Sequence, residues 1–73
     1  MRVRVDLESD ALYFRLSEAP IEASEELSPG IILDYNKEGN VVGIEILGIK
    51  KRFSMEELST LKAEMPAVAW PEP

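Results

Sequence analysis

Apolar and polar residues alternate along much of the first two thirds of the chain. In residues 1–6, Val3 and Val5 share one side of an extended backbone, while Arg2 and Arg4 share the other. A period of two with branched side chains predicts a half-buried β-strand. The pattern recurs after turns rich in Ser, Asp, Pro or Gly, which favour chain reversal. The predicted strands are residues 1–6, 11–16, 21–27, 31–35 and 41–47.

The third of these segments is the weakest strand prediction. Residues 21–27 contain Glu22, Glu25 and Glu26. Like charges repel across a β-ladder, so this segment is expected at a sheet edge rather than in the centre. A single helical turn around residues 24–26 is the competing interpretation.

The fourth and fifth strands form the clearest local motif. They are separated by residues 36–40, and Gly39 near the loop end fits a hairpin with a glycine in the left-handed conformation. The alternation places Ile32 with Val42, Ile44 and Ile46 on a buried face. The opposite face would carry Ile31, Leu33, Tyr35, Glu45 and Leu47. Apolar residues on both faces indicate a central place in the sheet, or one face against a helix and the other against a partner.

One helix is predicted after the hairpin. Ser54 and Glu57 have the spacing of a capping box, and Phe53 and Leu58 have that of a hydrophobic staple. Pro66 ends the helix at or just before residue 65. Its apolar stripe is Met55, Leu58, Leu61 and Met65.

These elements predict an α+β fold, an antiparallel β-meander of four to five strands with one C-terminal helix packed on the sheet. Residues 1–65 are expected to form a single domain. Residues 66–73 are expected to form a proline-punctuated tail, in which Trp70 is a plausible anchor to the body or to a neighbouring subunit.

Composition adds an expectation about assembly. The chain has 73 residues, no cysteine and no histidine, so neither disulfides nor thiolate or imidazole metal sites reinforce its small core. We therefore expect a homodimer. The absence of cysteine fits a cytoplasmic location, and no stretch is long and apolar enough to span a membrane.

The charge balance is acidic, with a net charge of −6. Nucleic-acid binders usually carry a basic face, so no nucleic-acid partner is expected. The run at 50–52, Lys-Lys-Arg, is read as solvated charge. Nucleic-acid binding through this run is a weaker alternative.

One pattern imitates a metal site. Asp34, Asn36, Glu38, Gly39 and Glu45 have nearly the spacing of an EF-hand calcium loop. The flanking residues are strand-like rather than helical, and Glu45 would lie down the second strand. A plain hairpin is therefore favoured, and no metal, cofactor or catalytic residue is predicted. Catalysis is not expected, since histidine, the commonest general acid or base, is absent.

Three stretches resemble a known family: Asp-Ala-Leu-Tyr-Phe-Arg-Leu-Ser at 10–17, residues 25–35, and Gly-Asn-Val-Val-Gly-Ile-Glu-Ile-Leu at 39–47. They are similar to the prokaryotic family catalogued as domain of unknown function 2283, over residues 5–47. Members usually carry Tyr-Asp before the first stretch, where this chain has Val5 and Asp6. The resemblance implies a small β-meander with a C-terminal helix and no known catalytic or binding residues. Gene-context analogy makes an antitoxin or adaptor role conceivable.

The leading functional hypothesis is a non-catalytic protein-interaction module, acting as a homodimer or with a partner protein. Its candidate interface residues are Tyr35, Leu33, Leu47 and Trp70. Ser54, Glu57, Phe53, Leu58 and Gly39 are assigned structural roles. The alternative is a small-molecule or metal-binding domain that uses surface carboxylates.

Overall fold

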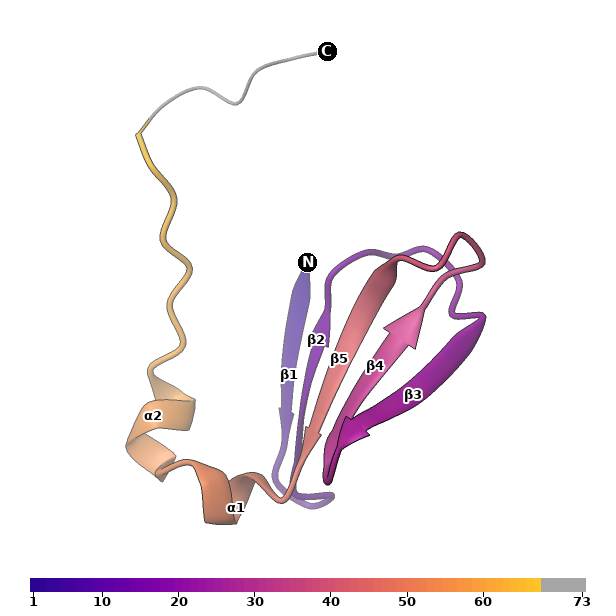
Figure 1. Cartoon of the computed structure of the whole chain (residues 1–73). Coiled ribbons are helices and arrows are strands. Elements are labelled where there is room, and N and C mark those ends of the chain that lie inside the picture. The colour runs from indigo at the N-terminus through magenta and orange to yellow at the C-terminus, as the bar shows by residue number, and fades with distance from the viewer. Residues whose placement is uncertain (68–73) are drawn as a thin grey trace.

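The computed structural model describes residues 1–67 as an antiparallel sheet followed by two short helices (Figure 1). The strands are β1 (Arg2–Asp6), β2 (Ala11–Arg15), β3 (Ala23–Ser28), β4 (Ile31–Tyr35) and β5 (Val41–Leu47). The helices are α1 (Ile49–Arg52) and α2 (Met55–Ser59). The architecture is α+β as predicted.

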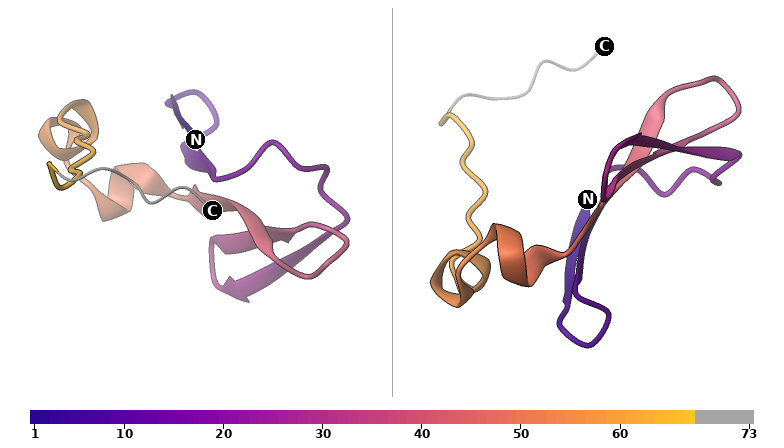
Figure 2. Two further views of the ribbon diagram at one scale, coloured as in Figure 1. Left: turned by 90° about the horizontal axis from the view of Figure 1, so that it is seen from above. Right: turned by 60° about the horizontal axis from the view of Figure 1, so that its bottom comes forward.

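The strand order is β1-β2-β5-β4-β3, so the prediction of a simple meander was wrong. β1 and β2 form one hairpin, β3, β4 and β5 form a meander, and the two units join where β2 pairs with β5. The connection from β2 to β3 passes the end of β5, where the Leu16 amide donates to the Val42 carbonyl at 2.8 Å. It then reaches the far edge of the sheet (Figures 1 and 2).

The charge of the strands agrees with which of them lie at the edges of the sheet. β3 is exposed along its whole length and carries two adjacent glutamates, and it takes one edge, as predicted. β1, which carries Arg2 and Arg4, takes the other edge. β2 and β5 supply the buried residues Ala11, Leu12, Val42 and Gly43, and they lie inside the sheet, where both strand edges are paired.

The register assigns each residue to a face, and it corrects one prediction. Leu33 pairs with Ile44, and Ile31 pairs with Ile46, so these four share a face. Ile32 pairs instead with Glu45. The predicted grouping of Ile32 with Ile44 and Ile46 was therefore wrong, because the true partner of each strand position is set by the register of the hairpin.

The hairpin turn between β4 and β5 is built by Asn36 and Gly39. The Asn36 side chain accepts hydrogen bonds from the amides of Glu38 and Asn40, at 3.1 and 2.9 Å. Gly39 has φ 84°, the left-handed conformation that glycine adopts without steric cost. The turn is of the kind that the spacing predicted.

Helix α1 was not predicted, and Asp10 holds it in place. Asp10 lies in the β1–β2 turn with φ 55°, and its carbonyl accepts the Gly48 and Ile49 amides at 2.8 and 3.3 Å. Its carboxylate accepts the Lys50 amide at 2.9 Å. Ile49 is thereby placed against the sheet with 0% exposure, and it completes the small buried core. The other buried apolar residues are Ala11, Leu12 and Val42.

Helix α2 is much shorter than predicted. The expected capping box is present: Ser54 accepts the Glu57 amide, and Glu57 accepts the Ser54 amide. The helix nevertheless ends at Ser59, because the Ser59 and Thr60 hydroxyls both donate to the Glu56 carbonyl, at 3.0 and 2.6 Å. Such side-chain bonds compete with the helical backbone.

Residues 53–67, which we call the arm, do not form the packed layer that was expected. Residues 60–67 have no helix or strand, and all of them are exposed. The arm leaves the end of the sheet and runs beside it (Figures 1 and 2). The predicted Trp70 anchor lies outside the described residues.

Candidate functional site

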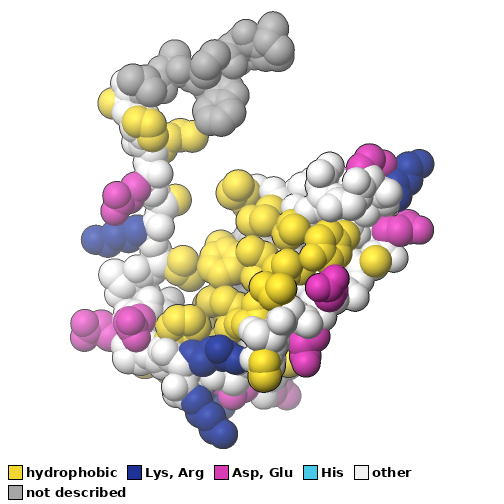
Figure 3. Space-filling view, in the orientation of Figure 1, with side chains coloured by type: hydrophobic (Ala, Val, Ile, Leu, Met, Phe, Trp, Pro, Cys, Tyr) yellow, Lys and Arg dark blue, Asp and Glu magenta, His cyan; other side chains and the backbone are white. Residues whose placement is uncertain are grey.

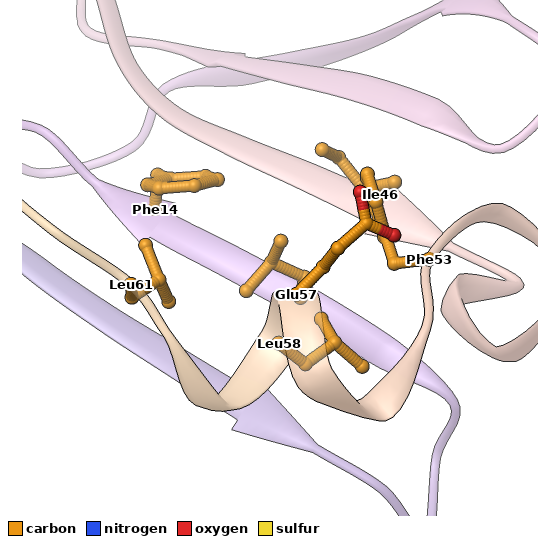
Figure 4. Close-up of a pocket in the computed structure, with 7 residues that line it drawn as sticks. Phe14, Ile46, Phe53, Glu57, Leu58 and Leu61 are labelled. Carbon is orange, nitrogen blue, oxygen red and sulfur yellow. The ribbon is translucent and has the colours of Figure 1, made fainter.

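An apolar groove lies between the sheet and α2. It has a volume of about 320 Å³. Phe14 and Ile46 come from the sheet, and Phe53, Leu58 and Leu61 come from the arm (Figure 4). The lining is almost wholly hydrocarbon, so the groove suits an apolar side chain and offers few groups for chemistry. The full lining is Leu12, Phe14, Ile46, Phe53, Glu57, Leu58 and Leu61.

The groove opens onto a wider apolar surface. Val3 pairs with Phe14 at the β1 edge and is 46% exposed. On the arm, Leu61 is 49% exposed and Met65 79% exposed. Hydrophobic side chains gather over this side of the sheet, next to the arm (Figure 3). We call this surface, comprising the groove with Val3, Leu33 and Ile44, the apolar face.

The predicted interface residues do not all lie on the apolar face. Leu33 does, opposite Ile44. Leu47 pairs with Ala11 on the other side of the sheet. Tyr35 lies at the end of β4, beyond a register shift, and pairs with Val41. Trp70 lies outside the described residues.

Sequence reasoning overlooked Phe14 as a possible interface residue. The alternation of Leu12, Phe14 and Leu16 placed them on one side of β2, and this was the available signal. It could not show that Phe14 would remain only half-buried, because that depends on the short α2.

The opposite face is polar and is organised around Asp34. This carboxylate is 7% exposed and accepts hydrogen bonds from the Tyr13 hydroxyl at 2.8 Å and the Ser24 hydroxyl at 2.6 Å. The three residues come from β2, β3 and β4, so the network spans the sheet. A buried carboxylate needs such partners, since an unsatisfied charge is costly to bury.

Gly43 makes the network possible. It pairs with Arg15 of β2 and with Asp34 of β4, so it lies on β5 between the strands that carry Tyr13 and Asp34. A Cβ atom at Gly43 would stand 2.5 Å from the Tyr13 hydroxyl oxygen and 2.9 Å from Asp34 Oδ2. The missing side chain therefore provides the space in which Tyr13 reaches across β5 to Asp34.

The environment alters the acidity of Tyr13. Burial raises the pKa of its phenol above the ordinary value, and the hydrogen bond to Asp34 raises this pKa further. The phenol is a protonated donor at neutral pH, and its raised pKa extends this state to higher pH.

A second feature of the polar face is a hollow of about 190 Å³. It is lined by Arg2, Arg4, Tyr13 and Arg15, and we call it the arginine hollow. Arg2 and Arg15 are direct cross-strand partners. At its rim, Arg2 Nε lies 2.8 Å from Glu18 Oε2, and this contact lowers the pKa of Glu18.

Surface carboxylates were the basis of the alternative, metal-binding hypothesis. Within residues 1–67, no three Asp or Glu side chains cluster as a metal site would require. The calcium-like spacing is a hairpin, in which Glu45 faces Tyr13 and Ile32 along the sheet. No helix in the described part of the chain is long and apolar enough to cross a membrane.

The basic run at 50–52 belongs to α1, and Arg52 is structural rather than free. Its Nε donates to the Leu47 carbonyl at 2.8 Å, and its Nη2 donates to the Pro29 carbonyl at 2.7 Å. Arg52 thus ties α1 to the β3–β4 turn. The prediction that this run is merely solvated charge was wrong for Arg52.

The fold and its surfaces define a small α+β protein with a five-stranded antiparallel sheet, apolar on one face and polar on the other. The chain belongs to the family described as protein of unknown function (DUF2283), whose model matches residues 2–50. The matched region contains all five strands and the first two residues of α1, and it stops before the arm. Comparisons with curated proteins and with solved structures gave no match.

Proposed function

We propose that this protein is a non-catalytic interaction module whose apolar face binds a second copy of the chain. The observation that carries the proposal is the incompletely covered apolar side of the sheet, on which Phe14, Leu33 and Ile44 are only half-buried. Stable domains bury such a side under a second layer of secondary structure. Here α2 spans only residues 55–59 and covers little of it.

The exposed area of the chain supports a second copy. The accessible surface is 5969 Å², whereas a compact protein of 8.2 kDa exposes about 4,500 Å². The Cα radius of gyration is 14.4 Å, against about 11 Å for a compact chain of this length. The excess surface exceeds the roughly 800 Å² that each partner buries in a standard interface.

The distribution of apolar residues also suits a two-fold dimer, whose interface must be complementary to itself. Each copy offers both a sheet face with Phe14 and Ile44 and an arm with Leu61 and Met65. The arm of each copy can therefore cover the sheet of the other. The groove residue Glu57 is already held by the Ser54 amide at 2.9 Å, so its charge is partly satisfied.

The test is the mass of the full chain at micromolar concentration, measured by sedimentation equilibrium. We expect a dimer of about 16 kDa, twice the mass of one chain. Val3→Glu should shift it toward monomer, because a buried charge without a partner is costly. Leu7→Glu is the matched control, since Leu7 is 43% exposed and Val3 46%, but Leu7 lies in the β1–β2 turn.

If the wild-type protein is monomeric, the proposal that a second copy binds the apolar face is wrong. If that monomer bound another protein and Val3→Glu abolished the binding, the face would serve an antitoxin- or adaptor-like role instead. If that monomer showed a radius of gyration near 11 Å in solution, the arm would have closed on its own sheet. We place the module in the cytoplasm, in keeping with its lack of cysteine.

A further inference from the structure

We propose that the arginine hollow is a binding site for a small oxyanion, the phosphate or carboxylate group of a metabolite. The site lies on the polar side of the sheet, whereas the apolar face carries the proposed dimer contact. The inference is therefore independent of the proposed function.

The first argument is the placing of like charges. Arg2 and Arg15 are direct partners across β1 and β2, and Arg4 is the partner of Tyr13 two pairs further along, on the same face. Like charges directly opposite each other in a sheet destabilise it. A bound anion between the guanidinium groups would remove this repulsion, because each group would gain an opposite charge.

The second argument is that two of the three arginines form no close ion pair. Within residues 1–67, the ion pair closer than 4 Å is that of Arg2 with Glu18. Both of these side chains are mostly exposed, at 69% and 64%. Arg4 and Arg15 have no carboxylate at that distance among the described residues. Asp34 accepts bonds from Tyr13 and Ser24 instead.

The third argument is that Arg15 is already ordered. Its Nη2 donates to the Ala19 carbonyl at 2.7 Å, and its Nη1 is enclosed by protein without a hydrogen-bond partner. A guanidinium held in one position loses little conformational entropy on binding, and this favours affinity. Arg4 supplies a more exposed fork that can contact two oxygens of a carboxylate or phosphate.

The size and charge of the surroundings set the class of ligand. A hollow of 190 Å³ is several times the roughly 30 Å³ that a water molecule occupies in the liquid, so a single oxyanion group fits. Asp6 and Glu45 line a neighbouring hollow that also contains Arg4. These acids and the net charge of −6 disfavour a long polyanion such as a nucleic acid. At physiological salt, charges more than about 8 Å away are largely screened. A small anion in the hollow would therefore interact mainly with the arginines that line it.

The experiment is a titration of the full chain with inorganic phosphate at constant ionic strength, followed by NMR of the arginine Nε–H groups. We expect saturable shifts at Arg4 and Arg15. Arg4→Gln should weaken binding at least about tenfold, the size of one lost charge-assisted contact. Arg4 is an exposed residue of an edge strand, so the substitution should leave the fold intact.

Lys51→Gln is the matched control, because Lys51 is an exposed cation on α1 outside the hollow. Unchanged binding in Lys51→Gln supports the site. Equal weakening in both variants, or shifts that never saturate, would show unspecific charge attraction and overturn it. Phenyl phosphate and benzoate then distinguish the two oxyanion sources. Saturable binding of phenyl phosphate or of benzoate supports the proposal. If neither compound binds and inorganic phosphate causes no shift, the proposal is contradicted.

Discussion

At the scale of single residues, the absence of a side chain at Gly43 shapes the polar face. A glycine inside a strand weakens it, because it packs nothing and costs entropy on folding. Here the empty position admits the Tyr13 hydroxyl, which bonds to Asp34 over the strand. The local cost at Gly43 is offset by the satisfaction of a carboxylate that is 7% exposed.

This arrangement predicts coupled substitutions. Gly43→Ala should destabilise the protein by about 1–3 kcal/mol, since its Cβ would overlap the Tyr13 hydroxyl. Tyr13→Phe should cost about 1–3 kcal/mol by removing one partner of Asp34. The double variant should cost less than the two changes combined, because Phe lacks the overlapping oxygen. Urea unfolding measures all three, and strict additivity would contradict the proposed geometry.

The raised pKa of Tyr13 predicts a response to alkali. The folded state holds the phenolic proton more tightly than the unfolded state, whose tyrosine titrates near about 10. The resulting stability is complete below that value and is lost as pH rises through the higher folded pKa. In Tyr35→Phe, ultraviolet absorbance should show Tyr13 ionising at higher pH than free tyrosine. Ionisation at or below the pH of free tyrosine would rule out the buried hydrogen bond.

At the scale of elements, α1 depends on a residue from another part of the chain. A four-residue helix is too short to be stable alone, since helix nucleation is costly. Asp10 accepts hydrogen bonds from the first amides of this segment, and Arg52, its last residue, donates to the carbonyls of Leu47 and Pro29. The helix is therefore a product of tertiary contact, and it seals the core with Ile49.

Substitutions at Asp10 separate the two parts of this contact. Asp10→Ala should cost about 2 kcal/mol, because it removes the acceptor of the Lys50 amide and places a Cβ residue at φ 55° without a polar side chain to favour it. Asp10→Gly should cost less, because glycine tolerates that φ. Thermal unfolding gives the comparison. A larger loss for glycine than for alanine would show that backbone conformation is not a factor.

At the scale of the whole molecule, the two faces of the sheet differ in polarity and in the partner that we propose for each. The apolar face is left open by the short α2, and this is the basis of the proposed dimer. The polar face is closed in its centre by the Asp34 network and is open at the arginine hollow. The family match covers the sheet but not the arm. The two strands that line the arginine hollow, β1 and β2, therefore lie within the matched residues. Much of the surface that we assign to dimerisation lies outside the match.

The sequence by itself determined the features that depend on neighbouring residues. These are the strand segments, the Asn36–Asn40 turn with Gly39, the edge character of β3 and the cap at Ser54. Each is set by side-chain alternation, by local charge or by hydrogen bonds within a few residues.

Only the tertiary structure decided the order of the strands and the membership of each face. Three contacts join residues far apart in the chain: β2 pairs with β5, Tyr13 donates across Gly43 to Asp34, and Asp10 accepts the first amides of α1. Alternation defines the two sides of a strand, but it does not say which strand lies beside it or in what register. The single polar and single apolar face arise from that register, because it places Leu33 beside Ile44 and Asp34 beside Gly43.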